Sequence, residues 1–447
     1  MTVGHLSGDR RPFDRGRRAL AAVSVVALTA SCAGGAVSAP DDDGGSGSGI
    51  TDRCASYDGT EGITDTSITV GFSGALSGPF AATGAHLWGM QAYFDMVNAA
   101  GGVETADGRK RTIELIYKDD HYVASTAKAN VQEMIDDKGV FAMLSVIGTS
   151  ANMAIRPVLD RACVPGLFAG TGSPELGNPD FPWQINGALA PYSAEGLIYA
   201  DYLSSNFPGG TIAVISQNDD YGRAKFQSLE TGLEGSDTTI VEHVTFEVTD
   251  PDLSGQITTL AATDADVLVI FALGAQALQL INTVSTRTDW NPQLLTSLLS
   301  VGQLESLDPG AGDGLLTTGS IDVDDPANAD LPGVADYLEW GAKAMARNKV
   351  ELPLSASTGG WVVGDLFVQA LEQAESLERA SVMEAVRDFR PDTGSLIMVP
   401  GIVLETGPDD PYLVEGMAIA RWNADAGTLD TVETIDLNGQ VPYTPLT

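Results

Sequence analysis

The feature that most constrains the fold of this chain is a regular alternation of short apolar strands with amphipathic helices. Up to Pro191 the pattern predicts strands at 67–72, 113–118, 140–146 and 164–169. After Pro191 the alternation starts again and predicts strands at 211–216, 240–246, 266–271 and 294–297. Strands and helices that alternate at intervals of about thirty residues form βαβ units with parallel sheets. The sequence therefore predicts two successive α/β lobes.

Beyond residue 315 the alternation loosens. Apolar spacing there predicts helices at 331–347, 358–374 and 379–389. Short strands are predicted near 397–404, 416–422 and 431–435.

Two predicted strands end in loops of small and hydroxyl-bearing residues, Gly148-Thr149-Ser150 and Gly170-Thr171-Gly172-Ser173. Such loops let backbone N–H groups approach a small ligand, and the helix that opens near Ser150 favours an anion at its N-terminus. In open parallel sheets, ligands bind beyond the carboxyl ends of the strands. Because the second lobe has its own loop at 217–222, the sequence predicts a ligand cleft between the lobes. Simple turn caps are the alternative interpretation of Thr149 and Thr171.

The first 32 residues have the pattern of an export signal. Five arginines precede an apolar run at 19–30, which is too short for a permanent membrane helix. The run ends in Leu28-Thr29-Ala30-Ser31-Cys32, which resembles a bacterial lipobox whose cysteine receives a lipid. A plain secretory signal is the alternative. Residues 33–60 are rich in small and polar residues and are predicted to be a flexible tether, so we expect a lipid-anchored, extracytoplasmic protein.

Charge and motif content exclude several classes of function. The formal net charge of −36 argues against nucleic-acid binding, which needs clustered basic residues. Four scattered histidines and the lack of a CxxC or HExxH motif argue against a metal site, and we expect no cofactor. No Gly-x-Ser-x-Gly motif is present, so we expect no enzyme. With Cys32 lipidated, Cys54 and Cys163 remain as a possible disulfide pair outside the cytoplasm.

The segments 67–102, 164–183, 191–203 and 211–229 together resemble the branched-chain amino acid type of solute-binding proteins, which have a type I periplasmic-binding fold and serve ABC importers. The resemblance covers roughly residues 61–440 and implies two Rossmann-like lobes joined by three crossovers, with a hinge motion that closes on ligand. It implies that lobe 1 comprises 61–190 with 320–404, and lobe 2 comprises 191–319 with 405–440.

The same resemblance implies which residues bind the ligand. Thr149, Ser150, Gly170, Thr171 and Gly172 match loops that hold a ligand carboxylate. Tyr221 matches an aromatic residue that the other lobe lays over the ligand.

The sequence departs from the amino-acid binders at the other end of the site. Leu273 stands where they have a tyrosine, and Ser297 or Leu298 stands where they have an acid that meets the ligand ammonium. Because an unpaired buried ammonium is costly, either Asp119, Asp219 or Asp220 supplies the counter-charge or the ligand has no ammonium. Solvated turn acids or helix caps are the alternative interpretation of these aspartates.

We therefore expect a monomeric receptor that captures a small polar organic molecule, such as an amino acid, an amide or a small carboxylate, and delivers it to an ABC permease. The alternative hypothesis is a sensory module of the same fold that signals to a membrane partner.

Overall fold

The computed structural model describes residues 54, 57, 59–296, 301–319, 321, 323–325 and 328–446. The predicted export signal, Cys32, Ser297 and Leu298 lie outside these residues. In the described ranges, no helix combines the length and the apolar character that crossing a bilayer requires.

The first sheet has six strands in the order β2-β3-β1-β4-β5-β6. Its strands are β1 (Ser67–Gly74), β2 (Val103–Glu104), β3 (Lys110–Asp119), β4 (Ala142–Leu144), β5 (Gly166–Ala169) and β6 (Gln184–Asn186). All neighbours pair in parallel except β2, which is antiparallel to β3. The central strands β4 and β5 are buried along their whole length, as expected for a parallel sheet that is covered on both faces.

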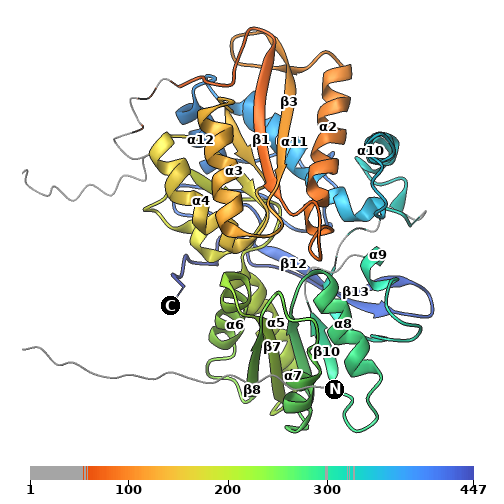
Figure 1. Ribbon diagram of the computed structural model, residues 1–447. Coiled ribbons are helices and arrows are strands. Elements are labelled where there is room, and N and C mark those ends of the chain that lie inside the picture. The colour runs from red at the N-terminus through yellow and green to blue at the C-terminus, as the bar shows by residue number, and fades with distance from the viewer. Residues whose placement is uncertain are drawn as a thin grey trace, which may run out of the picture. The chain divides into compact units, whose positions relative to one another are not determined.

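Helices cover both faces of this sheet, and we call the sheet with these helices lobe 1 (Figure 1). They are α2 (His86–Ala99), α3 (Ala124–Asp136), α4 (Thr149–Ala162), α10 (Val334–Asn348), α11 (Thr358–Gln373) and α12 (Arg379–Arg387), with short 3-10 turns η1 (Thr83–Ala85), η2 (Pro174–Gly177) and η4 (Leu354–Ser357). Helix α11 is apolar on most sides and packs against α2. The late helices α10 to α12 thus complete a lobe whose first strand, β1, precedes the strands β7 to β11 of the second sheet, so the second lobe is inserted into the first in sequence.

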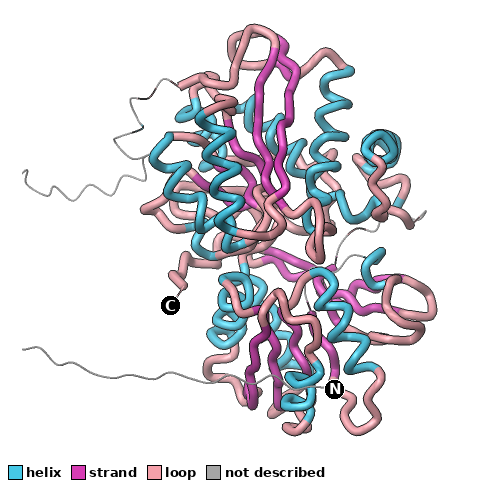
Figure 2. The backbone as a smooth tube through the Cα atoms, in the orientation of Figure 1, coloured by secondary structure: helices cyan, strands magenta, loops and turns pink. Residues whose placement is uncertain are grey.

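The second sheet has seven strands in the order β13-β12-β11-β10-β9-β7-β8. They are β7 (Thr211–Gln217), β8 (Thr239–Phe246), β9 (Val267–Phe271), β10 (Gln293–Thr296), β11 (Leu316–Gly319), β12 (Gly416–Asn423) and β13 (Thr428–Asp436). The helices before and between its strands β7 to β11 are α5 (Tyr192–Asn206), α6 (Asp220–Gly232), α7 (Ser254–Ala261), α8 (Gly274–Ser285) and α9 (Val301–Leu304). We call the sheet and helices α5 to α8 lobe 2; Figure 2 shows strands at the centre of each lobe and helices around them.

The structure confirms two α/β lobes and corrects two details of the prediction. The sheets are mostly parallel instead of wholly parallel, because β12 is antiparallel to both β11 and β13. The strand predicted at 397–404 does not form: of that segment only Leu404 makes a bridge, to Val414. Its apolar residues have another role, described below.

A disulfide joins Cys54 to Cys163. Cys54 is fully buried, although it lies within the segment predicted to be a flexible tether. Nearby, the Arg379 backbone N–H donates to the Gly59 carbonyl, and the Arg379 guanidinium donates to the carbonyls of Val140 and Phe141 at 2.7 and 2.9 Å. The chain just before β1 is therefore attached to lobe 1 by a covalent bond and by buried hydrogen bonds.

Candidate functional site

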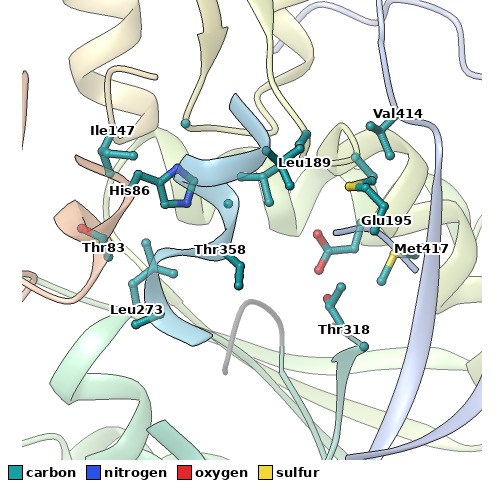
Figure 3. Close-up of a pocket in the computed structure, with 18 of the residues that line it drawn as sticks. Thr83, His86, Ile147, Leu189, Glu195, Leu273, Thr318, Thr358, Val414 and Met417 are labelled. Atoms are coloured by element: carbon teal, nitrogen blue, oxygen red, sulfur yellow. The ribbon is translucent and has the colours of Figure 1, made fainter. Parts of the chain in front are cut away.

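A cavity of about 320 Å³ lies between the strand ends of the two lobes (Figure 3). Lobe 1 contributes Gly148 and Thr149, which follow β4, and Gly170, which follows β5. Lobe 2 contributes Tyr221 after β7 and Leu273 after β9. This arrangement places the cavity beyond the carboxyl ends of parallel strands in both sheets, where α/β folds bind small ligands.

The loop after β4 is held by hydrogen bonds that orient its hydroxyl group. Gly148 has a φ of 99°, a conformation that favours glycine, and α4 begins at the next residue. Asn152 Nδ2 donates to the carbonyls of Val146 and Gly148 at 2.7 and 2.8 Å. Thr149, the first residue of α4, is thereby fixed with its backbone N–H at the positive end of the helix dipole.

The two predicted threonines are in direct contact. Thr149 Oγ1 lies 2.7 Å from Thr171 Oγ1, and Thr171 Oγ1 lies 3.3 Å from the Tyr192 hydroxyl. Burial raises the pKa of Tyr192 to about 12, although its hydrogen bonds to the threonines oppose the shift. Tyr192 therefore stays protonated at neutral pH, and the three hydroxyls form one connected, uncharged cluster beside the cavity.

The structure brings together part of the predicted site. Thr149, Gly170, Tyr221 and Leu273 line the cavity. Ser150, Thr171, Gly172 and Asp220 are not among the lining residues. Thr171 contacts Thr149 from behind, and Gly172 supports Tyr192 because its carbonyl accepts a 2.6 Å hydrogen bond from the Tyr192 N–H.

None of the three candidate aspartates lines the cavity. Asp119 accepts hydrogen bonds from Ser77 and from the backbone of Leu76, so it orders the loop after β1. Asp219 caps α6 through the Gly222 N–H at 3.0 Å. Asp220 forms an ion pair with Arg223 at the molecular surface. Each of these acids thus has a hydrogen-bond or ion-pair partner away from the cavity lining.

The lobe 2 wall is aromatic and contains a buried ion pair. Tyr192 and Tyr221 meet edge to face with ring centroids 5.5 Å apart. Lys225 Nζ lies 4.2 Å from the centroid of the Tyr192 ring and donates to Glu195 Oε2. Burial lowers the pKa of Lys225 while the attraction of Glu195 opposes the shift. Glu195 itself lines the cavity.

Two stacked aromatic residues from the lobe 1 part of the chain pack against lobe 2, and one of them, Tyr122, lines the cavity. The Phe80 and Tyr122 rings stack with centroids 4.5 Å apart, and both pack against the lobe 2 core. Burial raises the pKa of Tyr122 well above its usual range. Gln217 Oε1 accepts a 2.8 Å hydrogen bond from the Leu273 N–H and so fixes the neighbouring loop. The two lobes thus share an apolar contact next to the cavity.

Much of the remaining lining is apolar and was missed by the sequence analysis. Residues 188–190 and the loop at 397–402 contribute aliphatic side chains, together with Val362, Val414 and Met417. The sequence signal was present, because the predicted strand at 397–404 rested on these same apolar residues. In the structure these residues pack against the lobe 1 core and line the cavity, and they do not belong to a sheet.

Among the described residues that line the cavity, the histidine has its hydrogen-bond partner outside the lining. His86 lines the cavity, and burial lowers the pKa of His86 to about 4, so the imidazole is neutral at pH 7. Its Nδ1 lies 3.1 Å from Ser145 Oγ, but Ser145 is buried and does not line the cavity. Within the described ranges, no group of three potential metal ligands is present. The arrangement suits reversible binding of a partly apolar molecule.

Comparisons with known proteins agree with this architecture. A chain from Thermus thermophilus, described as a branched chain amino acid ABC transporter with bound valine, is 18% identical with a TM-score of 0.72, and the match covers 84% of this chain and 97% of that one. A fatty acid ABC transporter substrate-binding protein from Thermomonospora curvata is 21% identical with a TM-score of 0.70, covering 86% and 96%. A branched-chain amino acid substrate-binding protein from Streptococcus pneumoniae, in complex with isoleucine, is 19% identical with a TM-score of 0.65, covering 82% and 99%.

A search of curated proteins found no match to this sequence. The structural similarities, all at low identity, concern the fold. The family model described as "Periplasmic binding protein" matches residues 67–428, which include both sheets up to the first residue of β13 and every described residue that lines the cavity. Because one model spans both lobes and the site between them, the chain belongs to the periplasmic binding protein family.

Proposed function

We propose that this protein is the solute-binding component of an ABC importer and captures a small organic ligand between its lobes. The observation that carries the proposal is the cavity itself, which both lobes line at the carboxyl ends of their strands. Family membership supports an extracytoplasmic location. The valine and isoleucine complexes and the fatty acid transporter among the similar structures support a ligand with a carboxylate and an apolar body.

In this proposal the chain crosses between the lobes three times. Residues 61–190 and 320–404 form lobe 1, and residues 191–319 and 405–440 form lobe 2. Closure of the lobes brings Tyr221 and Leu273 over a ligand whose carboxylate lies near Thr149 and Gly170. The protein acts as a monomer without a cofactor and passes its ligand to a permease.

A thermal-shift screen of the purified protein tests binding. The probes are branched-chain amino acids, short amides, small carboxylates and octanoate, each at a concentration far above its expected Kd. A ligand at one hundred times its Kd stabilises the folded state by about 2.7 kcal/mol, which is readily measured. A protein that no probe stabilises would contradict the proposed ligand classes.

The contribution of the hydroxyl cluster is tested with Thr149→Val combined with Thr171→Val. This variant removes two hydroxyls at nearly constant shape and should abolish the thermal shift. The matched control is Thr258→Val with Thr259→Val on α7, where both hydroxyls bond to carbonyls of the same helix. An undiminished shift in the first variant would refute the role assigned to the cluster.

Membrane attachment is a separate part of the proposal. Lipidation of Cys32 would anchor the mature chain by its flexible tether to the outer face of the cell membrane. Labelling cells with a radioactive fatty acid should mark the wild-type protein and leave Cys32→Ala unmarked. Labelling of the variant would contradict a lipid at Cys32.

A further inference from the structure

Glu195 is the single charged side chain among the described residues that line the cavity. It lies in the first turn of α5 and is only 5% exposed. In Figure 3 its carboxylate points into the cavity, beside Thr318. In the sequence, Ser297 or Leu298 stands where amino-acid binders have an acid, and three aspartates were the candidates to replace that acid; Glu195 was not among them.

The two carboxylate oxygens of Glu195 have different surroundings. Oε2 accepts a hydrogen bond from Lys225 Nζ. Oε1 is buried and accepts no hydrogen bond of standard geometry from a described group; the neighbouring Tyr199 hydroxyl, which lies close to the Glu195 carboxylate, donates instead to the Thr296 carbonyl at 3.1 Å. A buried carboxylate oxygen without a donor is costly, because it has lost its water and gained nothing in return.

Three other acids with buried or partly buried partners do not share this feature. Asp107 uses both oxygens to accept from Arg111 at 2.8 Å. Glu415 accepts from the backbone N–H groups of Gly439 and Val441, one on each oxygen. Both oxygens of Glu175 also have donors, from Arg156 and from the Leu446 N–H. An ion pair that served stability alone would be expected to follow this pattern, so the open oxygen of Glu195 points to a partner that enters the cavity.

We propose that Glu195 Oε1 accepts a hydrogen bond from a donor group of the ligand, so that the ligand class is an apolar organic acid bearing an amine or a hydroxyl. This inference rests on the proposed function and names the ligand that the site selects. The donor group is set on an apolar body, because the lining on the Glu195 side of the cavity in Figure 3 includes Leu189, Val414 and Met417.

Lys225 determines what kind of donor is accepted. Its ammonium is 1% exposed and offsets the charge of Glu195, so the pair as a whole is neutral. Because the Glu195–Lys225 pair is neutral overall, Oε1 can accept a hydrogen bond from an uncharged donor as well as from a cation. An amine and a hydroxyl are therefore both compatible with Oε1, and the experiment separates them.

Two sets of probes place a donor at different distances from a carboxylate. The first set is L-leucine, 2-hydroxy-4-methylpentanoate and 4-methylpentanoate, which share one carbon skeleton. The second set is 8-aminooctanoate, 8-hydroxyoctanoate and octanoate. In at least one set, a donor-bearing probe should bind at least about tenfold more tightly than the plain acid by calorimetry.

The preference is then traced to Glu195 with Glu195→Gln combined with Lys225→Met, which removes both charges together. This variant should lose the preference while the Kd of the plain acid changes less than about twofold. Glu195→Asp is the second variant; it keeps the charge and the lysine partner but withdraws the carboxylate by one methylene, and it should weaken only donor-bearing probes. The matched control is Asp107→Asn with Arg111→Met, an ion pair outside the cavity, which should bind every probe as the wild type does.

The outcomes separate the two proposals. Plain acids that bind as tightly as their donor-bearing partners, or a preference that survives in both Glu195 variants, would overturn the inference and leave the importer function standing. If no probe of either set binds the wild-type protein, the proposed ligand class fails and the inference fails with it. A preference limited to the amine or to the hydroxyl identifies the donor.

Discussion

Removal of the Cys54–Cys163 disulfide should destabilise the protein strongly without unfolding it. The bond joins residues 109 positions apart. In the chain-entropy treatment of cross-links, a loop of this length restricts the unfolded chain by about 16 cal/mol/K, which corresponds to about 4.8 kcal/mol at 25 °C. We expect the observed loss to be about 3–5 kcal/mol, since measured effects of disulfides commonly fall below the entropic value.

The native state should survive this loss because other contacts hold the same segment. The Arg379 backbone N–H donates to Gly59, and its guanidinium donates to two lobe 1 carbonyls. Both cysteines are buried, so alanine is a better replacement than serine, whose hydroxyl would need a partner.

The assay is equilibrium urea unfolding of Cys54→Ala with Cys163→Ala, followed by circular dichroism. The expected result is a lower midpoint, while the wild type under a strong reductant moves toward the variant. Because loop entropy acts on the unfolded chain, the native spectrum of the variant should be that of the wild type. A loss below about 1 kcal/mol would refute the assignment of the stabilisation to this cross-link.

Three further predictions follow from buried contacts. A methyl group at Gly89 would lie 1.9 Å from the Ser357 carbonyl oxygen, so Gly89→Ala should lower the free energy of unfolding in urea by at least about 2 kcal/mol. The control is Gly255→Ala, which has open space around it and should be neutral or stabilising. Arg379→Met leaves two buried carbonyls without donors and should cost about 2–4 kcal/mol by the same assay, with a smaller loss for Arg379→Lys. Burial raises the pKa of Glu415 from its ordinary 4.5 to about 7, so the folded state binds a proton more tightly than the unfolded state. The free energy of unfolding should therefore fall as the pH rises from about 4.5 to about 7, by at most about 3 kcal/mol. An equal pH slope in Glu415→Gln would contradict the last prediction.

The fold was predictable because its strands and helices have strong local patterns. The strand β9 is buried at every position and reads as a continuous apolar run, and it begins one residue after the start of the strand predicted at 266–271. The two threonine loops were predictable for the same reason, since each follows such a strand. The pairing of β12 with β11 was not predictable from local sequence, because β11 lies about a hundred residues before β12.

The apolar half of the site was not predictable in this way. The residues at 397–402 are apolar because they face a cavity, and a cavity lining has no period of its own. A short run of apolar residues without structural context is readily interpreted as a buried strand, which is how the segment 397–404 was misassigned.

Glu195 illustrates the limit of local reasoning most clearly. A glutamate in the first turn of a helix is ordinarily a solvated residue that complements the helix dipole, and nothing in its neighbours suggests otherwise. Its role depends on Lys225, which lies thirty positions away on α6 and comes within hydrogen-bond distance only when the two helices pack. Lys225 in turn is buried under Tyr192, a residue that also contacts the Thr171 hydroxyl. The charged and the hydroxyl-bearing parts of the site are thus neighbours that both contact a single tyrosine, Tyr192. Ligand selection is in this view a property of the contact between lobes, and neither threonine loop specifies it alone.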